Sequence, residues 1–134
     1  LNFIELIEKQ SNLFAKYIGL KPNLKIQNMW LNINSYKDSN LGHIHGESVL
    51  SGVYYIDVPK DSGEIHFRPP YALFLPSYWP DKQAEKFTPF NSSYWEISPQ
   101  NNQLLIFPAW LEHAVTPNKN KTKKRITVAF NMSH

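Results

Sequence analysis

The chain has 134 residues, of which 42% are hydrophobic and 19% charged, so it can form one folded domain and is not disordered by composition. Cysteine is absent, which excludes disulfides, a thiolate nucleophile and cysteine-ligated zinc or iron–sulfur sites. No apolar run reaches the roughly 18 residues of a membrane helix. The net charge of +3 comes mainly from lysine, and a nucleic-acid reader would use more arginine than Arg68 and Arg125.

An amphipathic helix is expected at the N-terminus, from Phe3 to Ile18. Apolar residues recur there at three- and four-residue spacing, and Gly19 and Pro22 end the pattern. Because the sequence opens inside this pattern without a Met, we interpret it as an excised fragment of a longer chain.

Short β-type runs, separated by turn residues, make up most of the remaining chain. Eight strands are predicted: Lys25–Asn34, Leu41–His45, Ser48–Val58, Glu64–Arg68, Ser93–Ile97, Gln103–Phe107, Leu111–Thr116 and Lys123–Asn131. Eight short strands behind one helix predict an all-β barrel or sandwich. We therefore expect a single domain over residues 1–134, with a helical part over 1–22 and a barrel over 25–131.

The segment Pro69–Phe90 interrupts this pattern. Its five prolines exclude a central strand, and its aromatic residues make it too apolar for a free linker. We expect it to pack over the metal-side mouth of the barrel, either as a structural cover or as a lid that contacts substrate.

Three histidines form the candidate metal site. His43 and His45 are two residues apart on a predicted strand, so their side chains point to the same side and can converge on one ion. His113 lies on a later strand. A sequential pair with one distant histidine is a way to build a three-ligand metal face that keeps positions open for substrate and oxygen, as iron(II) enzymes require.

Arg125 and Tyr55 are candidates for binding an anion. Arg125 begins the last strand, where alternation places it on one face with Thr127 and Ala129. An arginine inside a barrel needs an anionic partner, which a dicarboxylate ligand would supply. Tyr55 shares a face with Ser51, and its hydroxyl could donate to the same carboxylate.

Four segments in order resemble the motifs of one family, over roughly Trp30 to Asn131. Residues 43–56, HIHGESVLSGVYYI, resemble its H-x-H-P-x-S…S-G-V-Y-Y motif. Residues 62–69, 97–115 and 125–131 resemble its later strands. The family consists of 2-oxoglutarate- and iron(II)-dependent oxygenases of marine bacteria and phages, related to the prolyl 4-hydroxylases. The sequence departs from the family at Gly46, where proline is usual, and at Asn102, where a turn glycine is usual.

The resemblance implies a double-stranded β-helix, or jelly roll. It implies iron(II) at His43 and His113, and 2-oxoglutarate bound through Arg125, with Tyr55 in support. We also place Asn32, a polar residue of the first strand, in the cosubstrate pocket.

Two residues, His45 and Glu47, are candidates for the third metal ligand. The motif favours His45, which completes a set of three histidines. Charge favours Glu47, because a carboxylate in the set His45, Glu47 and His113 better neutralises iron(II). A site of two histidines completed by water is the remaining alternative.

The function that the resemblance implies is an oxygenase, most simply a hydroxylase, that couples 2-oxoglutarate decarboxylation to substrate oxidation with O2. No catalytic residue is expected beyond the metal centre, and the primary substrate and oligomeric state cannot be read from the sequence. A three-histidine cupin-type enzyme without 2-oxoglutarate, or a non-catalytic jelly-roll binding module, are the alternatives. The expected location is the bacterial cytoplasm, or the host cytoplasm if a phage encodes the protein.

Overall fold

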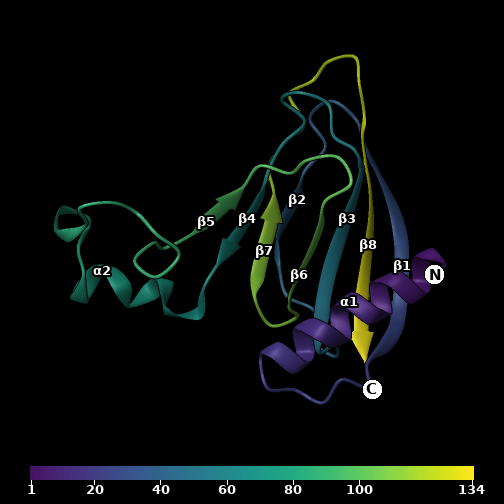
Figure 1. Cartoon of the computed structure of the whole chain (residues 1–134). Coiled ribbons are helices and arrows are strands. Elements are labelled where there is room, and N and C mark those ends of the chain that lie inside the picture. Colours follow the sequence, from purple (N-terminus) through teal and green to yellow (C-terminus); the bar gives the residue numbers. More distant parts are fainter.

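The computed structural model describes residues 1–134, and its eight strands form two antiparallel four-stranded sheets (Figure 1). The strands are β1 (Lys25–Asn34), β2 (Asn40–His43), β3 (Leu50–Asp57), β4 (Ile65–Arg68), β5 (Trp95–Ile97), β6 (Leu104–Pro108), β7 (Glu112–Val115) and β8 (Arg125–Ser133). The first sheet has the order β1-β8-β3-β6 and the second β2-β7-β4-β5. This is a jelly roll, so the predicted fold class is confirmed.

The N-terminal helix, α1 (Phe3–Tyr17), begins with a capping box between Asn2 and Glu5. Gly19 follows the helix with φ of +83°, a left-handed conformation that glycine adopts without steric cost. The predicted helix is therefore confirmed, one residue shorter than expected. None of the helices has the length and hydropathy that crossing a membrane would require.

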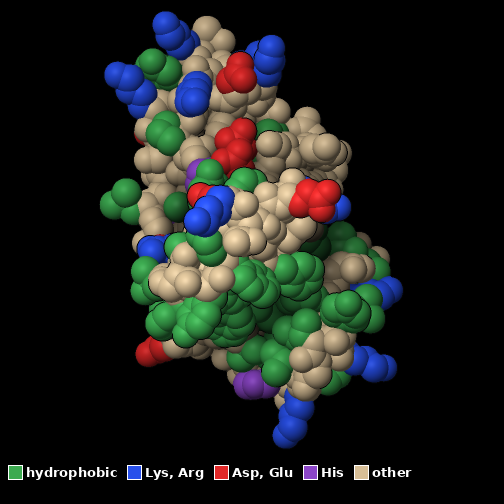
Figure 2. Space-filling model, turned by 90° about the vertical axis from the view of Figure 1, so that its left-hand side faces the viewer, with side chains coloured by type: hydrophobic (Ala, Val, Ile, Leu, Met, Phe, Trp, Pro, Cys, Tyr) green, Lys and Arg blue, Asp and Glu red, His purple; other side chains and the backbone are tan.

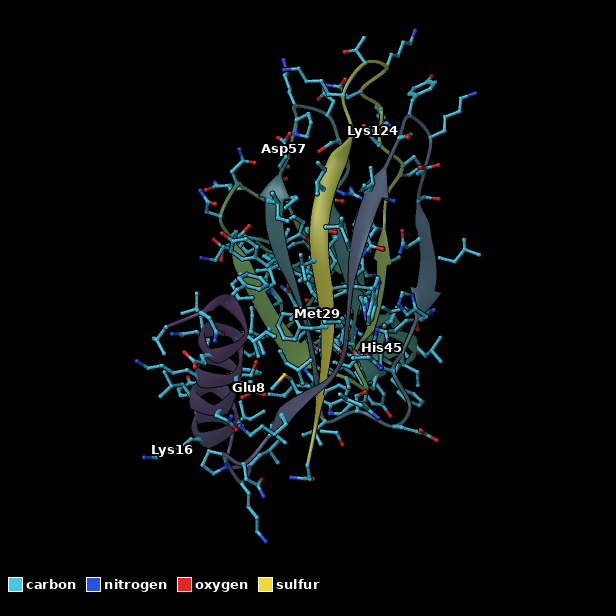
Figure 3. The ribbon with its side chains drawn as sticks, turned by 90° about the vertical axis from the view of Figure 1, so that its right-hand side faces the viewer. Glu8, Lys16, Met29, His45, Asp57 and Lys124 are labelled. Atoms are coloured by element: carbon cyan, nitrogen blue, oxygen red, sulfur yellow. The ribbon has the colours of Figure 1, made fainter.

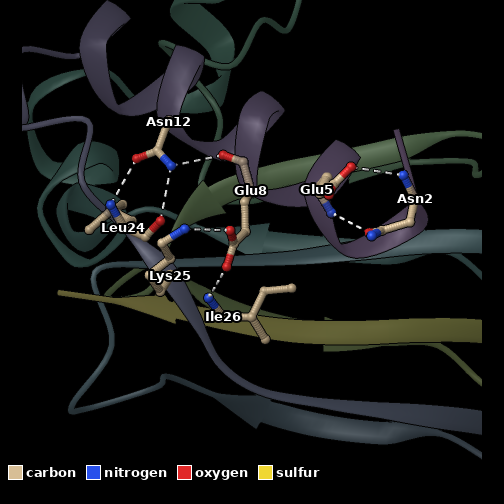
Figure 4. A network of polar contacts seen from close by, with 7 residues as sticks. All are labelled: Asn2, Glu5, Glu8, Asn12, Leu24, Lys25 and Ile26. Atoms are coloured by element: carbon tan, nitrogen blue, oxygen red, sulfur yellow. Dashed lines mark hydrogen bonds and ion pairs between the residues drawn. The ribbon is translucent and has the colours of Figure 1, made fainter.

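Side chains of α1 bind the backbone where β1 begins (Figure 4). Glu8 accepts hydrogen bonds from Lys25 Nζ at 2.9 Å and from the amide of Ile26 at 3.2 Å. Asn12 pairs with both backbone groups of Leu24, at 2.9 and 2.8 Å. These contacts hold the helix against the outer face of the first sheet, as predicted, and leave the space between the sheets free of it.

Two apolar clusters lie on opposite faces of the first sheet. The outer cluster joins α1 to the sheet and consists of Ile7, Ala15, Leu24, Leu50, Phe130 and Met132. The inner cluster, between the sheets, is smaller and consists of Ile65, Phe67 and Phe107. The inner side chains of β8 are polar apart from one alanine: Arg125, Thr127, Ala129 and Asn131. The wall that β8 contributes to the space between the sheets is therefore largely polar.

The segment that joins β4 to β5 contains three short helical turns, η1 (Pro70–Leu73), α2 (Leu75–Tyr78) and η2 (Asp81–Gln83). Figure 1 shows this segment projecting away from the two sheets, and Figure 2 shows apolar side chains gathered on the face that it presents. Tyr78 and Phe90 are 79% and 82% exposed. The segment also bonds to itself, since the hydroxyl of Tyr71 donates to the carbonyl of Pro89.

The expectation that this segment covers the barrel mouth stays a prediction, although the segment projects away from the two sheets here. Proline-initiated turns make the segment fold on itself, and its aromatic rings stay in solvent. The segment does leave β4 directly after Arg68, one register position beyond Phe67, which pairs with His113. A role on the substrate side therefore stays a prediction.

Candidate metal centre and its cavity

The three predicted histidines lie together between the sheets. β2 and β7 are antiparallel neighbours, and His43 is the direct register partner of His113. His45 follows β2, two residues after His43. The ring nitrogens that the three side chains offer lie within 4.8 Å of one another. Three imidazoles at this spacing can bind one divalent ion.

Main-chain carbonyls fix the rings of two of these histidines. The Nδ1 of His43 lies 2.7 Å from the carbonyl of Leu41, and the Nδ1 of His113 lies 2.9 Å from the carbonyl of Leu111. A carbonyl can only accept, so both Nδ1 atoms carry the proton and both Nε2 atoms keep a free lone pair. Each histidine donates to the carbonyl of the residue two positions before it. The Nε2 atoms of both rings are therefore available to bind a metal.

His45 is held differently. Its backbone amide donates to the carbonyl of Ala109 at 3.0 Å. Its Nδ1 faces a side chain instead of a carbonyl, with Asn131 Nδ2 at 3.4 Å. The three histidines are therefore not equivalent.

Burial favours the neutral form of His113 and His45. It lowers the pKa of His113 to about 4, and the neighbouring His43 and His45 act in the same direction. Burial, followed by the charge of His43, also lowers the pKa of His45. Neutral imidazole is the form that binds a metal, so the site suits metal binding at neutral pH.

Glu47, the alternative third ligand, is exposed in the turn after β2 and does not belong to the histidine cluster. The third side chain of the cluster is therefore the imidazole of His45. The cluster contains no carboxylate.

Arg125 is a buried cation without a carboxylate partner. It is 3% exposed, and its Nη1 donates to the carbonyl of Ser62 at 2.6 Å. The two ion pairs of the chain are Lys25–Glu8 and His66–Glu96, so neither involves Arg125. Burial accordingly lowers the pKa of Arg125.

The backbone at Gly63 makes room for this guanidinium. A Cβ at this position would lie 2.8 Å from Arg125 Nη1 and 2.4 Å from the carbonyl of Thr116, and the φ of +96° also requires glycine.

Tyr55 faces the same space from β3. It is buried, and burial raises the pKa of its hydroxyl to about 12 while the charge of Arg125 lowers it. The hydroxyl is thus protonated at neutral pH and can donate a hydrogen bond to an anion.

One cavity connects all the predicted site residues. Its walls include Asn32, His43, His45, Tyr55, His113 and Arg125. They also include Ser51 and Thr127. The cavity has imidazoles at one end and a buried cation at the other, which is the donor set that an ion and an organic anion together would need.

A second group of possible ligands lies on the outer face of the second sheet. Glu64, His66 and Glu96 place their ligand atoms within 4.8 Å of one another. His66 pairs with Glu96 across β4 and β5, and its ring stacks on Tyr94. This group is partly exposed and shares no residue with the histidine cluster, although Glu64 also lines the cavity.

Sequence reasoning did not single out Asn131 as a site residue. It is 5% exposed and contacts His45. The alternation that places Arg125, Thr127 and Ala129 on the inner face also places Asn131 there, and this signal could have identified it.

Comparisons with known proteins give the family. The model of the 2OG-Fe(II) oxygenase family matches residues 28–131. No curated protein matches the sequence. The structure is similar to an oxidoreductase of the 2OG-Fe(II) oxygenase family from Burkholderia pseudomallei, with a TM-score of 0.68, 12% identity, and 93% of this chain and 52% of that chain covered.

Two further solved structures have a similar fold. A prolyl-4-hydroxylase from Pseudomonas putida gives a TM-score of 0.63 at 11% identity, covering 98% of this chain and 64% of that one. EvdO2 from Micromonospora carbonacea, complexed with 2-oxoglutarate, gives a TM-score of 0.58 at 12% identity, covering 96% of this chain and 58% of that one. This chain thus spans between 52% and 64% of the length of these three proteins. The likeness establishes the shared fold, and the sequence match over residues 28–131 establishes that the chain belongs to the 2OG-Fe(II) oxygenase family.

Proposed function

We propose that this chain is an iron(II)- and 2-oxoglutarate-dependent oxygenase, with His43, His45 and His113 as the metal ligands. The observation that carries the proposal is the buried Arg125, which lacks a carboxylate partner and lines the same cavity as the three imidazoles. An unpaired buried charge costs several kcal/mol. An anionic ligand that also reaches the metal would remove this cost.

The side chains at the two ends of the cavity would bind different groups. Arg125 would bind the C5 carboxylate of 2-oxoglutarate with two parallel N–H donors, and the protonated hydroxyl of Tyr55 would donate to the same group. Asn32 would line the pocket between them and the metal. Iron(II), when bound, would supply the one-electron redox chemistry through which dioxygen oxidises an organic substrate.

The donor set of three neutral imidazoles has a consequence for cosubstrate binding. No protein carboxylate offsets the charge of the divalent ion at this cluster. The keto acid end of 2-oxoglutarate would supply the compensating negative charge. Metal and cosubstrate should therefore bind cooperatively, each strengthening the other.

The net reaction is a hydroxylation in which 2-oxoglutarate, O2 and a substrate C–H bond yield succinate, carbon dioxide and an alcohol. The atoms balance, since one oxygen atom enters succinate and the other enters the product.

The H-x-H motif supports a place among marine bacterial and phage members of the family. Because iron(II) needs a reducing environment, the cytoplasm stays the proposed location. The primary substrate belongs to the whole protein and is not specified by this site.

Anaerobic titration tests the proposal. Iron(II) should bind with one equivalent per chain, and 2-oxoglutarate should then bind at least about tenfold more tightly than without the metal. On admission of O2, the complex should form succinate. Metal binding with no effect of 2-oxoglutarate would favour the cupin-type enzyme, and the absence of metal binding would favour the binding module.

A further inference from the structure

A row of three polar side chains crosses the first sheet at the level of the histidines. Asn131 on β8 is the register partner of Asn28 on β1 and of Ser51 on β3. The Oγ of Ser51 donates to Asn131 Oδ1 at 2.7 Å, and Asn131 Nδ2 donates to Asn28 Oδ1 at 2.9 Å. Ser51 and Asn131 are 2% and 5% exposed, so the row is largely buried.

This row ends at His45, which follows β2 of the second sheet. Asn131 Nδ2 lies 3.4 Å from His45 Nδ1. Figure 3 shows His45 on the side of the first sheet opposite α1, where the inner side chains of β8 point. We propose that Asn131 is a positioning residue that sets the orientation and tautomer of His45, and with them its strength as the third metal ligand.

The chemistry of the contact explains how this residue would act. With Nδ2 facing the ring, Asn131 donates to Nδ1 of His45, and the ring proton then sits on Nε2. That tautomer has no lone pair on Nε2 for a metal. A half-turn of the amide presents Oδ1 to the ring instead, and Nδ1–H then donates to it while Nε2 becomes free.

The rest of the row can follow this half-turn. The hydroxyl of Ser51 and the amide of Asn28 both donate and accept, so each hydrogen bond of the row can reverse without leaving a buried group unpaired. His43 and His113 have no such freedom, because main-chain carbonyls fix their tautomers. Two ligands are therefore preset, and the third would become available only when the row reverses.

The inference rests on the proposed metal centre, and a double-mutant cycle separates the two. The probe is nickel(II), which binds imidazole more tightly than iron(II) and keeps weakened variants measurable. Asn131→Ala should lower nickel affinity about tenfold in the parent, as loss of a partner of a metal-bound histidine does. In the His45→Ala background, the same change should alter affinity less than twofold.

Controls and a second variant guard against a folding defect. Asn118→Ala also removes a buried, hydrogen-bonded asparagine, which binds the backbone of Asn34 at the end of β1 and of Lys123 just before β8. It should lower the melting temperature and leave nickel affinity within twofold. Ser51→Ala removes only the anchor of Asn131 and should lower affinity about threefold, again only when His45 is present.

Nitrogen NMR of the metal-free protein gives an independent readout. In the parent, Nδ1 of His45 should show the shift of an unprotonated nitrogen, whereas Nδ1 of His43 and of His113 should show that of a protonated one. Asn131→Ala should make the two tautomers of His45 interconvert. If the parent binds no nickel, the proposed metal centre fails and this inference with it. If the parent binds but Asn131→Ala and Ser51→Ala have equal effects with and without His45, only this inference is overturned.

Discussion

The two ends of the cavity are built from different sheets and in different ways. At the metal end, His43 and His113 come from β2 and β7 of the second sheet, and main-chain carbonyls complete their hydrogen bonding. At the opposite end, Arg125 and Tyr55 come from β8 and β3, at the centre of the first sheet. The first end carries neutral donors that are satisfied by local contacts, and the second carries a buried charge that is not paired.

This difference between the two ends indicates which ligand each end would bind, a metal ion at the histidines and an anion at Arg125. His43 and His113 have their ring orientation before any ion binds, because hydrogen bonds to the carbonyls of residues two positions away orient them. The cation end lacks its anionic partner within the protein. Changes at one end should therefore affect one ligand far more than the other, and the following variants test this separation.

The largest effect is expected at the metal end. His113→Ala removes a buried ring that the carbonyl of Leu111 orients, and nickel or iron(II) affinity should fall at least about 1,000-fold, or about 4 kcal/mol. Anaerobic calorimetry measures the loss. His66→Ala is the matched control, because His66 belongs to the outer group, and it should leave affinity within twofold. Equal losses in the two variants would mean that the ion binds elsewhere.

The next effect concerns the cation end. Arg125→Gln removes the charge and the paired donors at nearly constant volume, so 2-oxoglutarate affinity should fall by about 2–5 kcal/mol, or about 30-fold to several thousand-fold. Metal affinity should change less than threefold. Arg68→Gln, which alters the other arginine of the chain at an exposed site, is the control. A 2-oxoglutarate affinity within threefold of the parent in Arg125→Gln would refute the cosubstrate assignment.

The stability of the metal-free protein should depend on pH through His113. Its pKa is about 4 in the folded protein and about 6.5 when unfolded, so between these values the unfolded chain binds the extra proton. The free energy of unfolding should therefore fall as pH decreases from about 6.5 to about 4, by at most about 3 kcal/mol from this group. Urea denaturation at several pH values measures the slope. In His113→Gln, which cannot titrate, the slope should be shallower; an unchanged slope would contradict the assignment.

The smallest effect on stability is expected in the projecting segment. Trp79 is 58% exposed and directly follows α2 in the projecting segment, so Trp79→Ser should change the free energy of unfolding by less than about 0.5 kcal/mol. Phe107→Ala, within the cluster between the sheets, should cost about 3–5 kcal/mol. A loss above 1 kcal/mol for Trp79→Ser would show that the segment packs on the barrel in solution.

The strand pattern was predictable because alternation is a local property of the sequence. All eight strands occur where turn residues and alternating side chains place them, with ends that differ by at most two residues. Alternation also placed Arg125 on the inner face of β8 and Tyr55 on that of β3. Asn102, which stands where a turn glycine is usual, has a left-handed φ of +62°, a conformation that asparagine tolerates.

Features that depend on contacts between the sheets were not predictable in this way. The contact of Asn131 with His45 joins residues from different sheets, and no local pattern sets that distance. The orientation of Glu47 depends on the turn after β2, which carries it into solvent. The placement of the projecting segment was not predictable either, because its apolar composition indicated burial, whereas its prolines favour turns that leave its aromatic rings exposed.

The pairing of His43 with His113 has a consequence for local unfolding. β2 is an edge strand that pairs only with β7, through two register pairs, and three of its four residues are exposed. Such an edge opens readily, and its amides should exchange with solvent faster than those of β8. An ion held by both histidines would join the two strands by a non-covalent cross-link. Hydrogen exchange in β2 should then slow when metal binds, so the strand that carries a ligand would gain its order from the ion it binds.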